Sequence, residues 1–366
     1  MPLKQFRRRL LKYLPFIKSI LILVVILFCI FLIIKAVSPF YNFAKRNNIS
    51  LKFISSLLLN QNLPLKSYQD RTNVIILGIA GGEHDGSDLT DTMLFLSLDF
   101  KKHDVVMISL PRDIWLPSIQ DKINTAYHYG EVQKKGGGLI MAKAAIEEVI
   151  GQPVHYAWLI DFSGFKKLID LVEGVDIFVE KGFVDEYYPI PGRENDDCNG
   201  DPKYKCRYET LRFEKGLQHM EGERALKYVR SRQAEGEEGT DFARDKRQQQ
   251  IILALKNKIF QFSFFSKQDK LKQLINIVNE YSLSDMDLSE KILFAKFFLE
   301  LKNDNIRKIV LDNGDKNKNR EGFLINPPID SKYKNLWVLV PRSMDFSEIK
   351  QYIACQITDP NCVLSP

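Results

Sequence analysis

Arginines crowd one short stretch of this sequence, where their type and spacing suit phosphate chemistry. Arg230 and Arg232 alternate along the chain, so in an extended segment their side chains would point the same way. After a loop rich in Gly and Glu, Arg244 and Gln248 stand one helical turn apart and would project from one helix face. Arg247 lies one residue off this face, and an ion pair with a surface acid is its alternative role. Crowded guanidinium groups repel one another unless an anion lies between them, and their paired N–H groups suit phosphate oxygens. The segment therefore predicts a site for phosphate oxygens, against the alternative of a solvated basic helix.

A second candidate site is the loop rich in Gly and Asp from 81 to 91, between two apolar runs. Its glycines let the backbone approach a ligand closely. Asp85, Asp88 and Asp91 recur at every third position and offer oxygen ligands to a hard cation. Mg²⁺ prefers one or two carboxylates together with phosphate oxygens and water, so the loop predicts a Mg²⁺ site. An aspartate beside such a metal could also accept the proton of an attacking hydroxyl.

A third charged turn, Leu110-Pro111-Arg112-Asp113, stands where an apolar run ends. Arg112 could neutralise charge that develops on a leaving phosphate, which is an electrostatic role in phosphoryl transfer. For the single pair Arg112 and Asp113, a plain ion pair is the alternative. Taken together, the three charged segments form an inventory for Mg²⁺-assisted phosphate chemistry.

Apolar runs bounded by turn residues predict the elements that must position these side chains. We expect strands over 73–78, 92–98, 105–110, 154–160, 175–179 and 336–340. Helical periodicity predicts helices over 138–150, 162–172, 241–259 and 270–301. The polar turn 101–103 suggests that the second and third strands form an antiparallel hairpin. This alternation predicts an α/β fold, with helices covering a sheet of mixed strand directions.

The N-terminus has the composition of a membrane anchor. Six basic residues from Lys4 to Lys18 precede an apolar run from Ile20 to Val37. About twenty such residues can cross a bilayer as a helix, and the preceding positive charge keeps the N-terminus in the cytoplasm. A cleaved signal peptide is the alternative, but there is no clear Ala-x-Ala site and Lys35 interrupts the apolar run. We therefore expect a single-pass protein of the cell membrane with an extracytoplasmic body.

Cysteine usage and charge agree with an exported body. Outside the apolar run, the cysteines form two local pairs, Cys198/Cys206 and Cys355/Cys362, as expected for loop-closing disulfides. A metal site is the alternative, but no histidine accompanies either pair. The net charge of +6 comes largely from the N-terminal flank, so nucleic acid, which requires an extended basic surface, is not an expected partner.

Several motifs, in their order and spacing, make residues 70–260 resemble the LytR-CpsA-Psr (LCP) family of bacterial envelope proteins. These motifs are the strand 73–78, Thr90–Met93, Ser109–Asp113, Lys122–Tyr127 and the Arg-x-Arg…Asp-x-x-Arg-x-x-Arg-Gln-Gln segment. The resemblance implies an enzyme that moves a glycopolymer from a polyprenyl-(pyro)phosphate lipid onto a peptidoglycan-type acceptor. It also implies an α/β/α body with the lipid tail in an apolar cavity and the pyrophosphate against arginines and Mg²⁺.

The resemblance also assigns roles by position. It implies that the pyrophosphate is bound by Arg112, Arg230, Arg232, Arg244, Arg247 and Gln248. The catalytic residues that it implies are Asp91, Arg112 and Arg244. It also implies that Asp91 is a carboxylate near the metal, and the spacing of the loop adds Asp88 and Asp85 as candidate metal ligands.

This sequence departs from the family's pattern at two places. An aspartate commonly follows the first strand, and Ala80 stands there. An arginine commonly precedes the turn that holds Asp91, and Leu89 and Thr90 stand there. Asp85 or Asp88 could supply the missing carboxylate.

We divide the chain on this basis into five segments. They are a cytoplasmic basic tail (1–18), a transmembrane helix (19–38), an extracytoplasmic stalk (39–69), an LCP-like catalytic domain (70–265) and a C-terminal extension of the same body (266–366). Two alternative functions stay open: a hydrolase of polyprenyl pyrophosphate, and a non-enzymatic anchored binder of anionic polymer or lipid. Neither a Ser-His-Asp order nor a nucleotide-binding fingerprint occurs.

Overall fold

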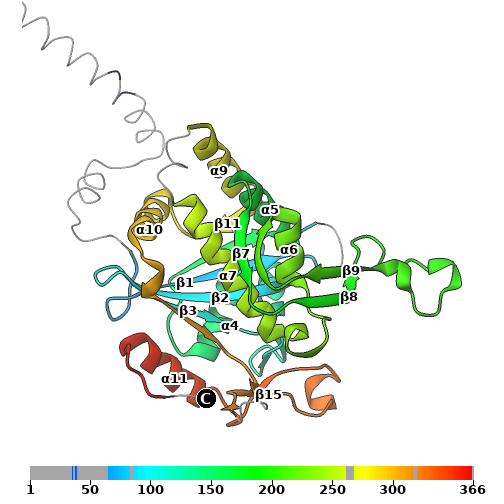
Figure 1. Cartoon of the computed structure of the whole chain (residues 1–366). Helices are drawn as coiled ribbons and strands as arrows, with labels where there is room; N and C mark the ends of the chain where they lie inside the picture. Colours follow the sequence, from blue (N-terminus) through cyan, green and yellow to red (C-terminus); the bar gives the residue numbers. More distant parts are fainter. Residues whose placement is uncertain are drawn as a thin grey trace, which may run out of the picture. The chain divides into compact units, whose positions relative to one another are not determined.

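The computed structural model describes residues 65–82, 86–260, 268–315 and 320–364, together with Lys35 and Ser38 (Figure 1). By internal contacts the chain divides into two units, Met1–Pro64 and Leu65–Pro366. The predicted tail and transmembrane helix and most of the stalk lie outside the described residues. Among the residues that are described, none of the helices is long and apolar enough to cross a membrane.

The second unit is built on a six-stranded sheet with the order β11-β6-β1-β2-β3-β12. Its strands are β1 (Thr72–Ile79), β2 (Thr90–Asp99), β3 (Asp104–Ser109), β6 (Tyr156–Asp161), β11 (Ser282–Ser284) and β12 (Ile306–Val310). Strand β2 runs antiparallel to both β1 and β3, whereas β6 is parallel to β1 and β12 is parallel to β3. The predicted hairpin and the predicted mixed strand directions are therefore confirmed.

Helices cover both faces of this sheet. They are α3 (Ala126–Gln133), α4 (Gly138–Ile150), α5 (Phe162–Leu171), α6 (Gly222–Arg230), α7 (Asp241–Ile259), α9 (Gln268–Tyr281), α10 (Leu288–Glu300) and α11 (Ser347–Thr358). Ile75 and Leu77 of β1 pack on α4 and α11, whereas Val74 packs on the opposite side with α7 and α10. Both sides of β1 are thus buried, which explains its nearly continuous apolar sequence.

Two antiparallel ribbons lie outside the central sheet (Figure 1). Strand β7 (Val175–Val179) pairs with β10 (Gly216–Met220), and β8 (Phe183–Pro189) pairs with β9 (Tyr208–Phe213). The remaining strands are two-residue pieces: β4 (Trp115–Leu116), β5 (Asp121–Lys122), β13 (Gly314–Asp315), β14 (Arg320–Glu321), β15 (Leu324–Ile325) and β16 (Val340–Pro341). The strand predicted at 175–179 is present, but it belongs to a ribbon rather than to the central sheet.

Three sequence-based expectations about local structure were wrong. The helix expected over 270–301 is two helices, because Asp287 and Glu290 form a capping box that starts α10 and β11 pairs with β6 before it. Arg230 is the last residue of α6 rather than part of a strand, because apolar residues at helical spacing bury that helix. The strand expected over 336–340 shrinks to Val340–Pro341, and its first residues are exposed.

The segment after residue 266 shares the sheet with the rest of the body. It supplies β11 at one edge and β12 at the other. Helix α7 is fastened to β12 by Gln249, whose Nε2 donates to the Ile309 carbonyl oxygen at 2.9 Å and to Ser109 Oγ at 2.8 Å. The position of α7 therefore depends on a strand from the C-terminal part of the chain.

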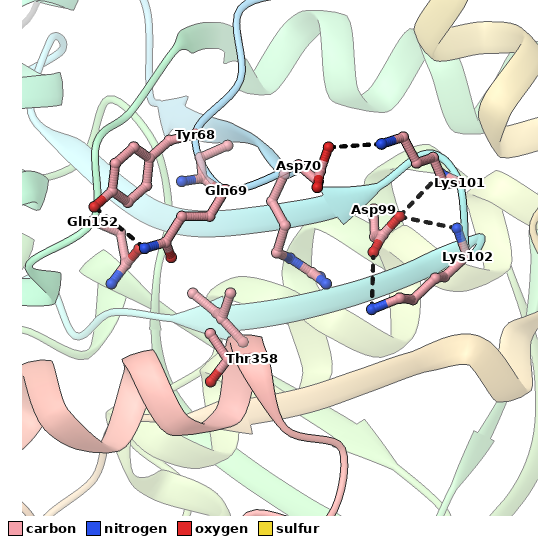
Figure 2. Close-up of a pocket in the computed structure, with 11 residues that line it drawn as sticks. Tyr68, Gln69, Asp70, Asp99, Lys101, Lys102, Gln152 and Thr358 are labelled. Carbon is pink, nitrogen blue, oxygen red and sulfur yellow. Dashed lines mark hydrogen bonds and ion pairs between the residues drawn. The ribbon is translucent and has the colours of Figure 1, made fainter.

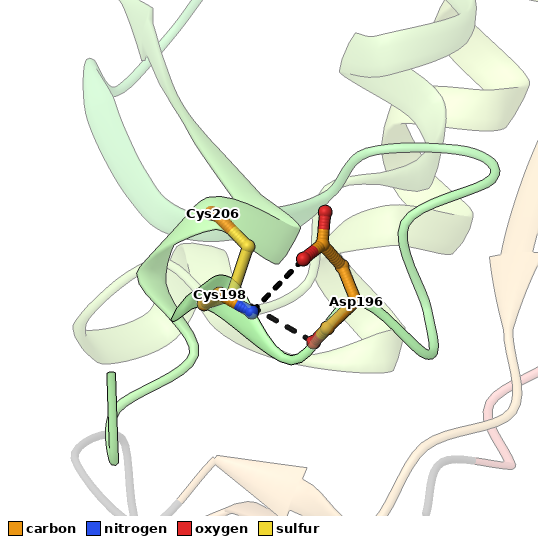
Figure 3. A group of neighbouring side chains, drawn as sticks. All are labelled: Asp196, Cys198 and Cys206. Atoms are coloured by element: carbon orange, nitrogen blue, oxygen red, sulfur yellow. Dashed lines mark hydrogen bonds between the residues drawn. A yellow bond between two sulfur atoms is a disulfide. The ribbon is translucent and has the colours of Figure 1, made fainter. Parts of the chain in front are cut away.

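Both predicted disulfides are present, Cys198–Cys206 and Cys355–Cys362. Asp196 lies beside the first of them, and the three side chains are close enough to surround a metal ion (Figure 3). However, both sulfurs are already bonded to each other, and zinc requires thiolates. Asp196 Oδ1 instead accepts a hydrogen bond of 2.9 Å from the Cys198 N–H. This group is therefore a turn closed by a disulfide, in the connection between β8 and β9.

The contact of Tyr156 with α10 predicts how the C-terminal part contributes to stability. The fully buried Tyr156 hydroxyl donates to Glu290 at 2.5 Å and accepts from the Lys66 N–H at 2.9 Å. We expect Tyr156→Phe to lower the free energy of unfolding by about 1–3 kcal/mol, because it removes both hydrogen bonds of the hydroxyl of a buried residue. Chemical denaturation of the full chain measures this change, and Tyr68→Phe, at a half-exposed tyrosine, serves as the control. An equal effect of both substitutions would contradict the prediction.

Candidate functional site

A polar cavity of about 120 Å³, here called the arginine cavity, opens where β2 begins. Its lining includes six of the residues predicted from the sequence: Asp91, Arg112, Arg230, Arg232, Arg244 and Gln248. They come from four parts of the chain: the start of β2, the turn after β3, the end of α6 with the segment that follows, and the first half of α7. The fold thus brings together residues that are up to 157 positions apart in sequence, from Asp91 to Gln248.

Arg112, which follows β3, forms an ion pair with Asp91 at the start of β2. Arg112 Nη1 donates to Asp91 Oδ1 at 2.6 Å, and its Nε lies 3.4 Å from Asp113 Oδ2 without making a hydrogen bond. Burial disfavours the charged form of Arg112, but Asp91 and Asp113 outweigh it, so the pKa of Arg112 is raised. Arg112 therefore keeps its positive charge, and its buried Nε remains a donor without an acceptor among the described residues.

Arg244 is the most enclosed arginine of the cavity, with 4% of its surface exposed. Its Nη1 lies 2.8 Å from Asp241 Oδ1, one turn earlier on α7. Within the described part of the chain, its Nε and Nη2 find no hydrogen-bond acceptor. Buried polar groups are nearly always satisfied, and a buried charged donor without a partner is costly. The unmet donors of Arg244 and Arg112 therefore indicate a place for an anionic ligand.

Arg230 and Arg232 complete the basic lining in different ways. The Arg230 guanidinium lies over the rings of Phe162 and Tyr188, at 4.7 and 5.8 Å from their centroids. Such cation–π contacts orient the group while leaving N–H donors at its edge. Arg232 is exposed at the rim, so it can move toward a ligand.

Asp185 organises this rim, and sequence reasoning missed it. Only 1% of Asp185 is exposed, and its Oδ2 accepts from Ser231 Oγ at 2.6 Å and from the N–H groups of Arg232 and Gln233 at 3.3 and 3.2 Å. It thereby fixes the turn that carries Arg232. The alternation along β8, which buries Phe183 and Asp185 on one face, is the signal that could have revealed it.

Arg247, predicted to bind pyrophosphate, does not line the arginine cavity. Its Nε donates to the Tyr228 carbonyl oxygen at 2.9 Å, its Nη2 donates to the Ser231 carbonyl oxygen, and its Nη1 pairs with Glu238 at 3.0 Å. Burial, the largest cause, lowers the pKa of Arg247. The guanidinium is therefore occupied by the backbone on either side of Arg230.

The three aspartates predicted as metal ligands lie in different surroundings. Asp91 lines the cavity, and its Oδ2 makes no hydrogen bond or ion pair with the described residues. Asp88 is not part of the lining and pairs with His128 Nδ1 at 2.7 Å. Asp85 lies outside the described residues. The described donor set therefore offers a cation one free carboxylate oxygen, which suits Mg²⁺ if phosphate oxygens complete its ligands.

An apolar cavity of about 220 Å³ adjoins the arginine cavity. Its walls include Ile76 of β1, Phe165 of α5 and Ile252 of α7. Four residues line both cavities: Thr92, Phe162, Val229 and Gln248. A cation-lined chamber that shares its wall with an apolar one suits an amphiphile with an anionic head and a hydrocarbon tail.

A third cavity, of about 190 Å³, lies at the opposite end of β1 and β2 (Figure 2). Its charged side chains are paired with one another: Lys101 with Asp70 at 2.7 Å, and Lys102 with Asp99 at 3.6 Å. Because these charges are already neutralised, this cavity offers an anion less than the arginine cavity does.

Asp245 is a buried acid beside the arginines. It is 3% exposed, its Oδ2 has no hydrogen-bond partner among the described residues, and its Oδ1 lies 3.8 Å from Arg244 Nη2. Burial raises its pKa to about 7, although Arg244, Arg247 and Arg112 lower it and only Asp241 adds to the rise. The carboxyl is thus poised to change its charge near neutral pH.

This raised pKa predicts a pH-dependent stability. The folded protein holds the Asp245 proton more tightly than the unfolded chain, so stability should fall as pH rises from about 4 to about 7 and then level off. We expect Asp245→Asn to remove this loss and to gain up to about 4 kcal/mol at pH 8 over wild type, with no gain below pH 4. Urea unfolding between pH 3.5 and 8.5 measures the difference, with the exposed Asp304→Asn as control. Parallel pH profiles of wild type and Asp245→Asn would contradict it.

Sequence comparison finds relatives among bacterial envelope enzymes. The chain is 28% identical over 227 residues to the polyisoprenyl-teichoic acid–peptidoglycan teichoic acid transferase TagU of Oceanobacillus iheyensis, covering 61% of each chain. It is 29% identical over 203 residues to a TagU of Bacillus cereus, covering 54% of this chain and 55% of the relative. The chain thus spans less than two thirds of the length of these relatives.

Comparison with solved structures shows a shared fold. The structure of B. subtilis TagV matches with a TM-score of 0.55 at 21% identity, over 82% of this chain and 100% of TagV. The structure of TagT bound to LIIa-WTA matches with a TM-score of 0.52 at 20% identity, over 79% of this chain and 92% of TagT. Because the LytR_cpsA_psr family matches residues 38–335 of the 366 in this sequence, the chain belongs to that family.

Proposed function

We propose that this protein transfers a glycopolymer from a polyprenyl-(pyro)phosphate lipid onto a peptidoglycan-type acceptor. The single observation that carries the proposal is that the arginine cavity, with its unsatisfied arginine donors, shares four lining residues with the apolar cavity. The pyrophosphate would occupy the arginine cavity, and the start of the prenyl tail would occupy the apolar cavity. The TagU relatives, which are named polyisoprenyl-teichoic acid–peptidoglycan teichoic acid transferases, support the same assignment.

In the proposed reaction, a hydroxyl oxygen of the acceptor sugar forms a bond to the phosphorus that carries the glycopolymer. The bond from this phosphorus to the bridging oxygen breaks, and polyprenyl phosphate leaves with the electron pair. The hydroxyl proton passes to water; in the alternative in which Asp91 holds no cation, it passes to Asp91 Oδ2. Arg112 and Arg244 supply donors where negative charge grows on the leaving phosphate, and preorganised donors of this kind strongly stabilise a transition state.

The cation is the second part of the proposal. We propose that Asp91 holds a Mg²⁺ ion through Oδ2, with pyrophosphate oxygens as further ligands. When bound, the ion would supply additional charge neutralisation at the phosphates. Asp88 and Asp85 are the less favoured ligands, the former because His128 already engages it.

We further propose that the body lies outside the cytoplasm, beside the membrane that holds its lipid substrate. Two disulfides support this placement, because such bonds persist in oxidising compartments. The predicted anchor over 19–38 would then hold the body close to the donor lipid.

The arginine assignment predicts the outcome of a transfer assay. The full chain in detergent is mixed with a short-prenyl pyrophosphate glycan, Mg²⁺ and peptidoglycan fragments, and products are followed by mass spectrometry. We expect Arg244→Ala to lower kcat for the phosphodiester-linked product about 10²–10³-fold, as loss of a preorganised donor does elsewhere. The control Arg212→Ala, at an exposed arginine outside the cavities described here, should behave like wild type.

Other products would point to other functions. Lipid phosphate released without an adduct, in the presence of acceptor, would indicate a hydrolase. Donor binding without turnover would indicate a non-enzymatic binder. Either result would contradict the transferase proposal.

The role of Asp91 predicts a change in cation binding. We expect Asp91→Asn to weaken Mn²⁺ binding in the presence of donor by about tenfold or more, measured by electron paramagnetic resonance, because an amide is a poorer ligand for a hard cation. The control Asp88→Asn should leave it nearly unchanged. If Asp91→Asn instead lowers kcat at unchanged cation affinity, Asp91 is the proton acceptor and the ligand assignment is wrong.

A further inference from the structure

A long polar groove of about 770 Å³ runs along the other side of α7, between that helix and β12. We call it the α7–β12 groove. It is larger than the arginine and apolar cavities together. The residues of α7 that line it, such as Ala243 and Lys246, project from a different side of the helix than Arg244 and Gln248. One helix thus separates the groove from the arginine cavity.

The lining of the groove offers hydrogen-bond donors and acceptors, and its basic and acidic residues are nearly equal in number. Lys246 of α7 and Lys308 of β12 are exposed and make no ion pair with the described residues. Gln250 accepts from the Tyr228 hydroxyl at 3.1 Å through Oε1, which leaves its amide N–H groups as donors. The acids of the groove are engaged within the protein, Glu238 with Arg247 and Asp312 with Arg320.

The first turn of α7 borders both the groove and the arginine cavity. Thr240, which caps the N-terminus of α7 through the Ala243 N–H at 3.1 Å, lines the groove. The next residue, Asp241, pairs with Arg244, which lines the arginine cavity. Arg247 lines the groove and donates to the carbonyl oxygen of Ser231, which stands between Arg230 and Arg232 of the arginine cavity.

The chemistry of the lining selects among possible occupants. Charged side chains on both walls, such as Lys246, Lys308 and Glu180, make the groove a poor site for a prenyl chain. Because most acids and basic residues of the walls pair with each other, the groove also lacks the dense positive charge that a polymer with a phosphate in each repeat would require. A chain of sugars, whose hydroxyls both donate and accept, matches amides, lysines and paired acids in one groove. Phe242 and Tyr352 add apolar surface for the faces of sugar rings.

We infer that the α7–β12 groove binds the glycan strand of the acceptor, and that Lys246, Lys308 and Gln250 are its main contacts. This inference rests on the proposed function, because it assigns the second substrate of that reaction to a separate site. The acceptor strand would lie along α7 and present a sugar hydroxyl past Thr240 toward the phosphorus.

The test measures glycan binding directly. The full chain in detergent is titrated by calorimetry with peptidoglycan glycan strands freed of their stem peptides. We expect the double substitution Lys246→Glu and Lys308→Glu to weaken binding about tenfold or more, and Gln250→Ala to weaken it severalfold without a change of charge. Lys135→Glu, at an exposed lysine that lines none of the cavities described here, is the matched control.

Binding of the donor separates this inference from the proposed function. Donor affinity should be unchanged in the lysine variants, and Arg244→Ala should weaken donor binding but leave glycan binding intact. If transfer fails in every assay while glycan binding still depends on the two lysines, the proposed function falls and the groove remains a glycan site. If wild type does not bind the strands, if the lysine variants bind them as wild type does, or if free stem peptides bind in their place, the inference is overturned.

Discussion

The buried guanidinium of Arg247 is the interaction on which the architecture of the site depends. It ties α7 to the carbonyl oxygens of Tyr228 and Ser231, while Asp185 holds the other side of the same turn. A charge buried this deeply is tolerated only because its hydrogen bonds are filled by the protein itself. The two neighbouring arginines therefore differ in role. Arg247 holds α6 and the following turn against α7, whereas Arg244 keeps donors without an acceptor among the described residues.

Unequal satisfaction of buried charges is also what makes the arginine cavity chemically distinct. Arg71, which precedes β1, by contrast finds acceptors for Nε, Nη1 and Nη2 at 2.8–2.9 Å. At the edge of β2, Arg112 and Arg244 do not fill all of theirs. Packing of the layers on both sides of the sheet offsets the cost of these unpaired donors, and the proposed anion would supply the missing acceptors. Stability and ligand affinity thus draw on the same few atoms.

Much of this could be predicted from the sequence. The polar turn 101–103 predicted that β2 and β3 pair, and the family motifs implied that Asp91, Arg112, Arg230, Arg232, Arg244 and Gln248 belong to one site. The partner of Arg247 could not be predicted, because its acceptors are backbone carbonyl oxygens, which carry no sequence signal. The ribbon formed by β7 was also missed, since periodicity identifies a strand but not its neighbour. Arg230 was misassigned because two alternating arginines fit either the end of a helix or a strand.

The position of β12 late in the sequence has a consequence for folding during synthesis. Gln249 joins α7 to β12 and to Ser109. The helix that carries Arg244 therefore lacks part of its packing surface until the chain has been synthesised through β12. Pairing of β12 with β3 joins segments about two hundred positions apart, and such distant pairings form slowly. In the proposed topology, a chain still crossing the membrane would lack the complete arginine cavity. Under the proposed function, its catalytic activity would then arise only after export is nearly complete, so a partly folded chain would not bind carrier lipids.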